Sequence, residues 1–471
     1  MSATDLLEKS RTKPGASTAG KSPARGTKLV VLSADGMRPD FYRRAADYGL
    51  KIPTLRTLVD SGASADAVES IYPSTTYPAH ATLVTGVPPS VHGIYGHLAS
   101  LDPTEPARPW CWHARALRVP ALWDVARASG RKTAAISWPV SAGAGIDYNI
   151  PEIWDPALPD PHRDFSRVAQ HSSPGLFEEV AKTLIAQAHA GTGHSHKPSR
   201  KSPHGHALTL PEVSPDRLRA EAALYLWARY KPDLLLVHFV RYDQQAHRFG
   251  PLSPEALAAC EEMDTEIGRI REALAGSGPV TLVVLSDHGF VPVEKEAAPL
   301  VVFAEEQLFG RDKKGKPQLD RLGAVHAGGS FAVYWLEEPS TEDRNKLGKA
   351  LRRLLETHAV AEILGRNRLG DLEADPDAEV MLEAAPGFYF SDRFEGPVVR
   401  DTVKDRGTHG QLPTCPGLEA SFIAVGQGIV PGKNLGRFSL RRVAPTLAHL
   451  LGLPQDILAS KERAVELGKR D

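Results

Sequence analysis

Acidic and histidine side chains recur at the points where apolar runs of this 471-residue chain end, or in a glycine-rich stretch. Six such residues are Asp35, Asp243, His247, Asp287, His288 and His409. Each of them taken singly fits an ordinary turn or surface position. Together, three carboxylates and three imidazoles form the mixed oxygen and nitrogen ligand set that suits two zinc or manganese ions. The pattern therefore predicts a centre with two divalent metal ions.

A second stretch, "YPSTTYPAHATLVTG" at 72–86, sets Ser74, Thr75 and Thr76 between two prolines. It predicts a turn that leads into a helix, and helix N-termini favour phosphate oxygens. One interpretation is a plain N-cap in a proline-fixed turn. The other is a nucleophile, because paired divalent ions roughly 3.5–4 Å apart can clamp the attacking and leaving oxygens of a displacement. With the metal centre in view, attack by one of these hydroxyls is the better interpretation.

Strands and helices must alternate to bring these residues together. Near-continuous apolar runs predict buried strands at 28–36, 131–139, 232–240, 280–289 and 421–428. The segment 253–278 begins with Ser253 as a helix N-cap and Pro254 in the first turn, and it carries an apolar stripe. This alternation predicts an α/β fold with a mainly parallel sheet. Such sheets bind ligands beyond the carboxyl ends of their strands, where the acidic and histidine residues stand.

Two segments interrupt the alternation. Residues 296–404 carry short strand-like pieces and a helix-like stretch, and we expect an inserted small α+β lobe between 28–295 and 405–460. Residues 186–206 hold five histidines among Gly, Ser, Lys and Pro. We expect this second segment to be a solvated loop rather than a metal site.

The overall composition excludes several classes. With 56 basic and 57 acidic residues the formal net charge is −1, so no nucleic-acid polymer is expected as a partner. Cys111, Cys260 and Cys415 show no CxxC spacing, which predicts reduced thiols. No run is long enough to span a bilayer, and residues 1–27 lack the apolar segment of a signal peptide. We therefore expect a disordered tail and a cytoplasmic protein, of an oligomeric state that the sequence leaves open.

The order and spacing of the motifs resemble the alkaline phosphatase superfamily, and within it the nucleotide pyrophosphatase/phosphodiesterase branch of autotaxin-like enzymes. The resemblance runs from about residue 28 to 455. It rests on "SADGMRPD", "YPSTTYPAHATLVTG", "PDLLLVHFVRYDQQAHRFGP", "LSDHGF" and "GTHG", in that order. It implies an α/β three-layer sandwich of the alkaline phosphatase type with an inserted small lobe.

The resemblance also implies roles for single residues. It selects Thr76 as the nucleophile, rather than Ser74 or Thr75. It further implies two zinc ions, manganese being the other candidate. The implied ligands are Asp35, Thr76, Asp287 and His288 for one ion, and Asp243, His247 and His409 for the other.

This chain departs from the family pattern in its expected substrate contacts. Family diesterases usually show two asparagines after "HGI", whereas "VHGIYGH" puts His97 where an amide would hold phosphate. A histidine can also donate, with a strength that depends on pH. The aromatic pair that often brackets a base corresponds to Tyr77 and His238, of which only Tyr77 is a strong stacking surface. Nucleotide preference and the choice between diester and monoester stay open.

The implied activity is hydrolysis of phosphodiester or pyrophosphate bonds in a small, nucleotide-like substrate, through a phosphothreonine intermediate. One alternative is a phosphomonoesterase or phosphonate hydrolase of the same superfamily, because ligands and nucleophile would be shared. A minor alternative is a metal-stabilised binding protein without turnover. All seven ligand and nucleophile positions are filled, which argues against that alternative.

Overall fold

The computed structural model describes residues 27–105, 108–155, 158, 165–192, 213–311, 313, 317–318, 320–454 and 458–468. The predicted disordered tail lies outside the described residues, apart from Thr27. The predicted histidine-rich loop lies partly outside them. Its first residues continue helix α8 (Leu176–Thr192), which corrects the expectation of a loop from residue 186. Three alanines, at positions 186, 188 and 190, favour this continuation because alanine has the highest helix propensity.

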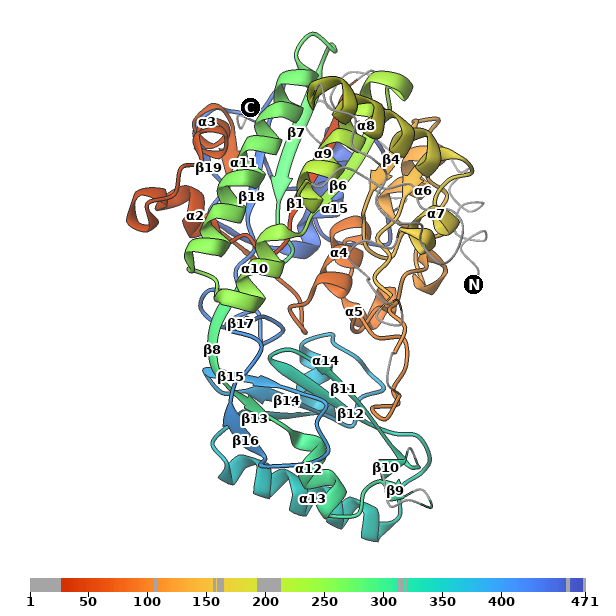
Figure 1. Ribbon diagram of the computed structural model, residues 1–471, viewed down its shortest axis with the longest axis vertical. Helices are drawn as coiled ribbons and strands as arrows, with labels where there is room; N and C mark the ends of the chain where they lie inside the picture. Colours follow the sequence, from red (N-terminus) through yellow and green to blue (C-terminus); the bar gives the residue numbers. More distant parts are fainter. Residues whose placement is uncertain are drawn as a thin grey trace.

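An eight-stranded sheet forms the centre of the larger part of the molecule (Figure 1). Its strands in spatial order are β19 (Lys433–Asn434), β2 (Ala63–Ser64), β18 (Phe422–Val425), β7 (Val280–Leu285), β1 (Lys28–Ala34), β6 (Leu234–Phe239), β4 (Thr133–Ile136) and β5 (Tyr148–Ile150). The strands from β7 to β5 are all parallel, while β18 pairs antiparallel with both neighbours. All five predicted strands are present, in a sheet that is mainly parallel as expected.

Helices cover both faces of this sheet because successive strand residues point to opposite sides. Val30 and Leu32 of β1 pack against one layer, and Leu29 and Val31 against the other. The first layer comprises α2 (Pro39–Arg43), α3 (Pro53–Ser61), α8, α9 (Pro215–Tyr230), α10 (Arg241–Phe249) and α11 (Pro254–Leu274). The second comprises α4 (Thr76–Thr85), α6 (Leu122–Ala128) and α15 (Val443–Leu450). The predicted cap at Ser253 is present, since its hydroxyl accepts a bond from the Ala256 amide.

A smaller part contains the segment that the sequence marks as inserted. Its antiparallel sheet has the order β11 (Leu322–Ala327), β12 (Ser330–Trp335), β14 (Val380–Ala384) and β13 (Val360–Gly365). Around it lie α12 (Pro299–Glu305), α13 (Thr341–Glu356), α14 (Arg366–Asp371), β9 (Gly310–Arg311) and β10 (Pro317–Gln318). This part has a hydrophobic cluster of its own, built on Phe303, Phe331 and Leu382. The domain limits at 296 and 404 stay a prediction.

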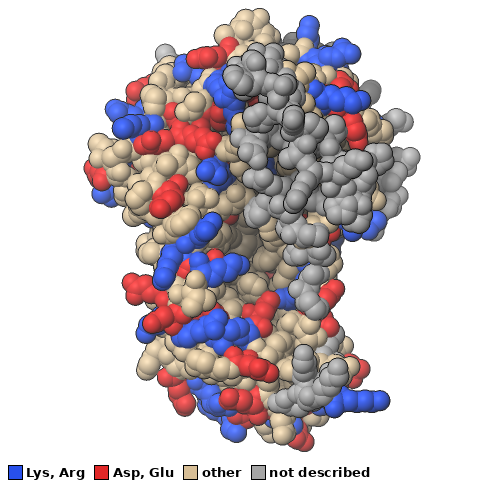
Figure 2. Space-filling view, in the orientation of Figure 1, with Lys and Arg blue, Asp and Glu red and all other residues tan. Residues whose placement is uncertain are grey.

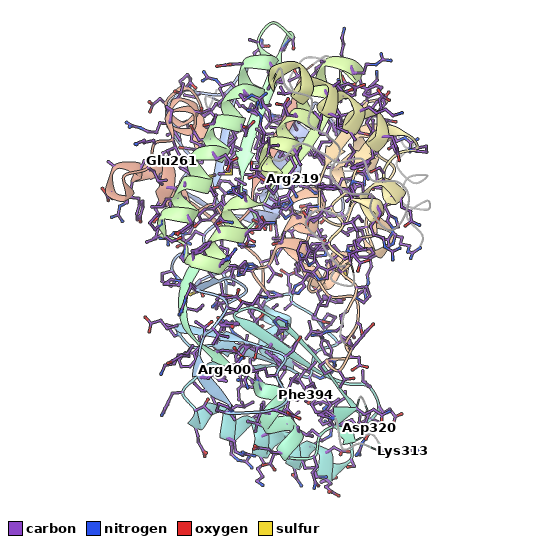
Figure 3. The ribbon with its side chains drawn as sticks, viewed as in Figure 1. Arg219, Glu261, Lys313, Asp320, Phe394 and Arg400 are labelled. Atoms are coloured by element: carbon purple, nitrogen blue, oxygen red, sulfur yellow. The ribbon has the colours of Figure 1, made fainter. Side chains whose placement is uncertain are left out.

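Strand β8 (Val291–Ala297) runs from the larger part to the smaller one (Figure 1). It pairs with β15 (Gly387–Phe390), β16 (Val399–Asp401) and β17 (Gly407–Thr408). Glu296 of β8 is buried and contacts the guanidinium groups of Arg393 and Arg400, the latter at 2.9 Å. Figure 3 labels Arg400 beside this strand group. Ion pairs therefore tie the strands at this junction.

Several short elements complete the described structure. They are β3 (Ala67–Glu69) and β20 (Arg437–Ser439), which pair with each other, α5 (Pro89–His92), α7 (Ser166–His171), and 3-10 turns at Ala45–Tyr48, Ala114–Ala116 and Leu440–Arg442. Among the described residues, no helix has the length and apolar character needed to cross a membrane. Acidic and basic side chains are mixed over the face seen in Figure 2, in line with the balanced net charge. The three cysteines are free, as expected.

Candidate active site

The carboxyl ends of β1, β6 and β7 meet at one edge of the central sheet, because β1 pairs in parallel with both neighbours. Asp35 directly follows β1, and Asp287 and His288 stand within three residues of the end of β7. Asp243 and His247 lie on α10, just past β6. Their four-residue spacing places them on one face of that helix. These five side chains come together as the strand-end pattern predicts.

His409 reaches the same place from the loop after β17. The two glycines of its "GTHG" motif permit close packing. A Cβ atom on Gly407 would collide with the carbonyl oxygen of Ala246 on α10, and one on Gly410 with that of Ala327 on β11. Gly410 also has a φ of +103°, which favours glycine. The loop that carries His409 is therefore held between α10 and the smaller part of the molecule.

One group of donor atoms comprises Asp243, His247 and His409, within 4.8 Å of one another. The two Nε2 atoms lie 3.2 Å apart, and each is 3.6 Å from Oδ1 of Asp243. The Nδ1 atoms face backbone carbonyls at 3.1 Å, those of Gly407 for His247 and of Ser74 for His409. Because a carbonyl oxygen only accepts, each Nδ1 donates and each Nε2 keeps its lone pair for a ligand.

A second group comprises Asp35, Asp243 and His288, also within 4.8 Å. The Nε2 atom of His288 lies 3.4 Å from Oδ1 of Asp35 and 3.1 Å from Oδ2 of Asp287. Its Nδ1 faces the carbonyl of Gly289 at 3.0 Å, which again leaves Nε2 with a lone pair. Asp243 thus borders both groups, whereas the family resemblance implies that it serves one. Asp287 stands at the edge of the second group.

Unpaired oxygens of the three aspartates indicate whether metal ions fit this site. Each has one buried oxygen without a hydrogen-bond partner, namely Oδ1 of Asp35, Oδ1 of Asp243 and Oδ2 of Asp287. Leaving a buried polar atom unpaired costs about 1–3 kcal/mol, and more for a charged one. Burial and the two neighbouring aspartates raise the pKa of Asp35 well above its ordinary value. Divalent cations between these oxygens and the imidazole lone pairs would remove both penalties, so the residues present fit a two-metal centre.

The three hydroxyls of the turn before α4 differ in their surroundings. Ser74 is fully buried and donates to the carbonyl of Ile71 at 2.9 Å. Thr75 is the N-cap residue of α4, and its Oγ1 is buried without a partner. Thr76 opens α4, is only half-buried, and places its Oγ1 3.3 Å from Nε2 of His288. Of the three, Thr76 alone combines access from outside with contact to the donor groups.

The expected substrate contacts lie near the site but differ in access. His97 is half-buried, and its ring lies 4.8 Å from that of Trp110. Burial, His326 and Arg108 lower the pKa of His97 to about 3, so its ring is neutral at neutral pH. Tyr77 and His238 are both fully buried.

His238 lies between two carboxylates, with Nδ1 2.7 Å from Glu152 and Nε2 3.0 Å from Oδ2 of Asp35. Burial opposes the charged ring, but the two carboxylates outweigh it and raise the pKa of His238 to about 10. In this arrangement neither Tyr77 nor His238 presents a free ring face to a ligand. Their assignment to substrate binding stays a prediction.

Some residues near the site are not marked by any pattern in the sequence. Glu152 follows β5, a strand end like those that mark the aspartates, but this three-residue edge strand gives no apolar run to notice. His326 on β11 lies 3.3 Å from Asp392, which also pairs with the buried Arg108. The ring of His326 is 6.2 Å from that of His97. His326 and Asp392 come from the smaller part, and only the tertiary fold brings them to the site.

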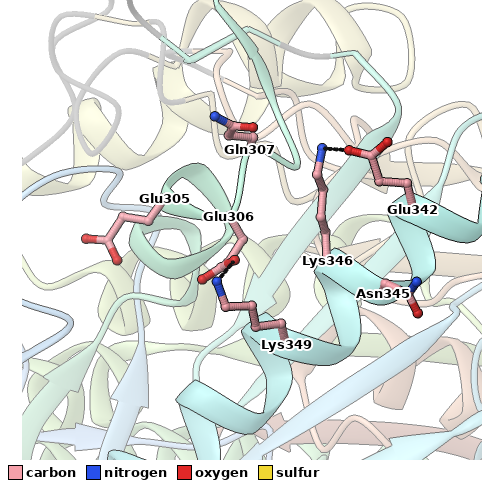
Figure 4. Close-up of a pocket in the computed structure, with 7 residues that line it drawn as sticks. All are labelled: Glu305, Glu306, Gln307, Glu342, Asn345, Lys346 and Lys349. Carbon is pink, nitrogen blue, oxygen red and sulfur yellow. Dashed lines mark ion pairs between the residues drawn. The ribbon is translucent and has the colours of Figure 1, made fainter.

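A depression of about 410 Å³ lies elsewhere, between α12 and α13 (Figure 4). Its walls carry charged side chains that pair with each other. Lys349 lies 2.9 Å from Glu306, and Lys346 lies 2.8 Å from Glu342. None of its lining residues belongs to the donor groups. We assign it no chemistry.

Comparisons with known proteins point to one family. The sequence model of a family described as type I phosphodiesterase / nucleotide pyrophosphatase matches residues 29–412. A pyrophosphatase/phosphodiesterase of Schizosaccharomyces pombe is 24% identical over 443 residues, which are 90% of this chain and 77% of that protein. Human ectonucleotide pyrophosphatase/phosphodiesterase family member 7 is 25% identical over 296 residues, or 62% of this chain and 54% of that protein. The chain thus matches little more than half the length of the human relative.

Among solved structures, murine ectonucleotide pyrophosphatase / phosphodiesterase 5, an inactive variant in complex with AMP, has a TM-score of 0.61 to this chain. The match covers 91% of this chain and 96% of that chain, at 17% identity. At this level of identity the likeness establishes the fold. The expected α/β fold is confirmed.

Proposed function

The chain belongs to the type I phosphodiesterase / nucleotide pyrophosphatase family, and on this premise we propose that it hydrolyses phosphodiester or pyrophosphate bonds through a covalent intermediate on Thr76. The observation that carries the proposal is the half-buried Thr76 hydroxyl beside His288, a member of one of the two groups of metal donors. Ser74 and Thr75 lack that combination of access and contact.

We assign the donors to two divalent ions, zinc by preference and manganese as the alternative. His247, His409 and Asp243 would hold one ion; Asp35, Asp287 and His288, with the hydroxyl of Thr76, would hold the other. Divalent ions in such a centre lower the pKa of a coordinated hydroxyl and neutralise charge that develops on the attacking and leaving oxygens. The mixed donor set supports this assignment because zinc accepts both imidazole and carboxylate.

Thr76 would act as the nucleophile in the first of two displacements. Its Oγ1 loses a proton and bonds to phosphorus, while the leaving oxygen departs with the electron pair of the broken P–O bond. Water then attacks the same phosphorus, and Oγ1 of Thr76 departs and regains a proton. The position of Thr76 at the first turn of α4 favours this chemistry, because the free amides of a helix N-terminus attract phosphate oxygens.

His97 would hold a non-bridging phosphate oxygen in place of the asparagine found in related diesterases. Its neutral ring carries one N–H, enough for a single hydrogen bond. A small nucleotide-like diester is the proposed substrate class, and the AMP bound by the murine relative supports it.

Turnover of bis-p-nitrophenyl phosphate and p-nitrophenyl phosphate by metal-loaded protein tests the proposal. A higher kcat/KM for the diester supports it. A preference for the monoester would favour the phosphomonoesterase alternative, for which His97 in place of asparagine is the specific observation. Absence of turnover with either ester, at full metal content, would leave the binding protein as the better account.

A further inference from the structure

The aromatic residues nearest to the proposed nucleophile are closed off from ligands. Tyr77 follows Thr76 directly, yet its ring is fully buried. It lies edge-to-face against the indole of Trp110, with centroids 5.3 Å apart and planes at 84°. The ring nitrogens of His238 are both taken by carboxylates. Neither residue is therefore free to offer an aromatic surface to the organic part of a substrate.

Trp110 is placed to supply that surface. It is half-buried, and its ring contacts those of Tyr77 and of His97, the residue proposed to bind a phosphate oxygen. Trp154, also half-buried, lies beyond it at 6.1 Å between ring centroids, with the planes at 45°. We call Trp110 and Trp154 the tryptophan shelf. By contrast, Trp123 and Trp138, which pack the core, are at most 1% exposed.

The backbone fixes Trp110 beside His97. Leu98 and Trp110 form an antiparallel bridge, and the amide of Cys111 donates to the carbonyl of His97 at 2.8 Å. The next aromatic residue supports the other half of the shelf, because Nε1 of Trp112 donates to the carbonyl of Trp154 at 3.1 Å. The shelf is thus held in place before any substrate arrives, which lowers the entropy cost of binding.

We propose that Trp110 is a specificity-determining residue, whose indole stacks on a planar aromatic substituent of the phosphate ester. Stacking on an indole requires a flat ring and tolerates different ring chemistries. Esters with an aryl or heteroaryl substituent would then be preferred over saturated ones of equal size. The inference rests on the proposed function, since it concerns the substrate of the same site.

Two esters that share one leaving group isolate this effect. Phenyl p-nitrophenyl phosphate and cyclohexyl p-nitrophenyl phosphate release the same p-nitrophenolate but differ in the planarity of the retained ring. Trp110→Ala should lower the phenyl-to-cyclohexyl ratio of kcat/KM by about tenfold, the order expected for one lost stacking contact. Trp110→Phe should keep the ratio within about threefold of the parent.

Trp335→Ala serves as the matched control, because this half-buried tryptophan packs against the hydrophobic cluster of the smaller part. Its ratio should equal that of the parent. A Trp110→Ala ratio that stays parental while both rates fall would reduce Trp110 to a packing role and overturn the inference. A ratio that rises would also overturn it, because Trp110 would then be covering a stacking surface on Tyr77.

The binding of non-hydrolysable phosphonates tests the role of Trp110 independently of turnover. If the parent hydrolyses neither ester, the proposed function fails. Calorimetry with phenylphosphonate and cyclohexylphosphonate on metal-loaded parent and Trp110→Ala then tests the shelf by itself. Trp110→Ala should lower the preference for the phenyl compound by about tenfold. An equal preference in both proteins would contradict the inference.

Discussion

The Nε2 atom of His288 lies 3.3 Å from Oγ1 of Thr76, although 212 positions separate the two residues in the chain. The contact joins the first turn of α4 to the loop after β7. It places the hydroxyl beside one of the two donor groups, so that an ion held by His288 would have the threonine oxygen nearby.

The purified protein should carry close to two divalent ions per chain. Asp243 and His409 are assigned to the same ion, so Asp243→Ala and His409→Ala should each empty or weaken one of the two sites. Elemental analysis of folded variants measures the difference, and zinc or manganese should restore activity after chelation. Equal metal content in both variants and the parent would remove these residues from the ligand set.

His97 should support catalysis without imposing a pH limit. Burial, His326 and Arg108 lower its pKa to about 3, so its ring stays neutral from about pH 5 to 9. This replaces the expectation that its donation would vary near neutrality. His97→Ala should cost roughly tenfold or more in kcat/KM for a diester, as one lost bond to a charged oxygen, and His97→Asn should recover most of it. A pH profile of kcat/KM with an acid limb near pH 6.5, absent in His97→Asn, would contradict a His97 ring that stays neutral.

His92 should make the fold sensitive to acid. Its ring is fully buried, Nδ1 accepts from the amide of Ile94 at 3.1 Å, and Nε2 lies 3.1 Å from Oγ1 of Thr82. Burial lowers its pKa from 6.5 to about 3. Between these two values the unfolded chain binds a proton that the folded chain does not, so the free energy of unfolding falls as the pH falls.

The contribution of His92 should approach about 1.4 kcal/mol per pH unit between pH 6 and 4. Denaturant unfolding at several pH values measures it. His92→Gln should reduce the slope of unfolding free energy against pH by about 1.4 kcal/mol per pH unit, the amount that one proton contributes. A slope equal to that of the parent would show that His92 is already protonated in the folded protein, or is not buried as described.

The fold and the convergence of the site could be predicted because both depend on short-range patterns. Apolar runs mark the parallel strands, and Asp35, Asp243 and Asp287 stand where those runs end. A parallel sheet brings such ends to one edge, so spacing in sequence translates into proximity in space. The glycines of "GTHG" follow the same logic, since Gly407 and Gly410 allow backbones to approach closely.

Tertiary contacts around the site could not be predicted from the sequence. Nothing local marks His326 or Asp392 as neighbours of His97, and nothing shows that Trp110 covers Tyr77. The burial of Tyr77 and His238 likewise results from tertiary packing. Sequence motifs thus identify the candidate metal donors and hydroxyls, while the surroundings of His97 and Tyr77 depend on Trp110 and on the smaller part.

Replacing the hydroxyls one at a time should identify the nucleophile. Thr76→Ala should lose several orders of magnitude in kcat while keeping most of its metal, because the other ligands remain. Thr76→Ser should keep partial activity. Thr75→Ala should be nearly silent, since the Oγ1 of Thr75 is buried and, unlike that of Thr76, makes no hydrogen bond to a histidine of the site. An inactive Thr75→Ala beside an active Thr76→Ala would move the nucleophile by one residue.

The stereochemical course at phosphorus tests the covalent intermediate most directly. A phosphorothioate diester of a single configuration is hydrolysed in isotopically labelled water, and the configuration of the product is determined. Attack by Thr76 followed by attack of water makes two in-line displacements, each with inversion, so the account predicts net retention. Net inversion would show a single displacement by water and contradict the phosphothreonine mechanism.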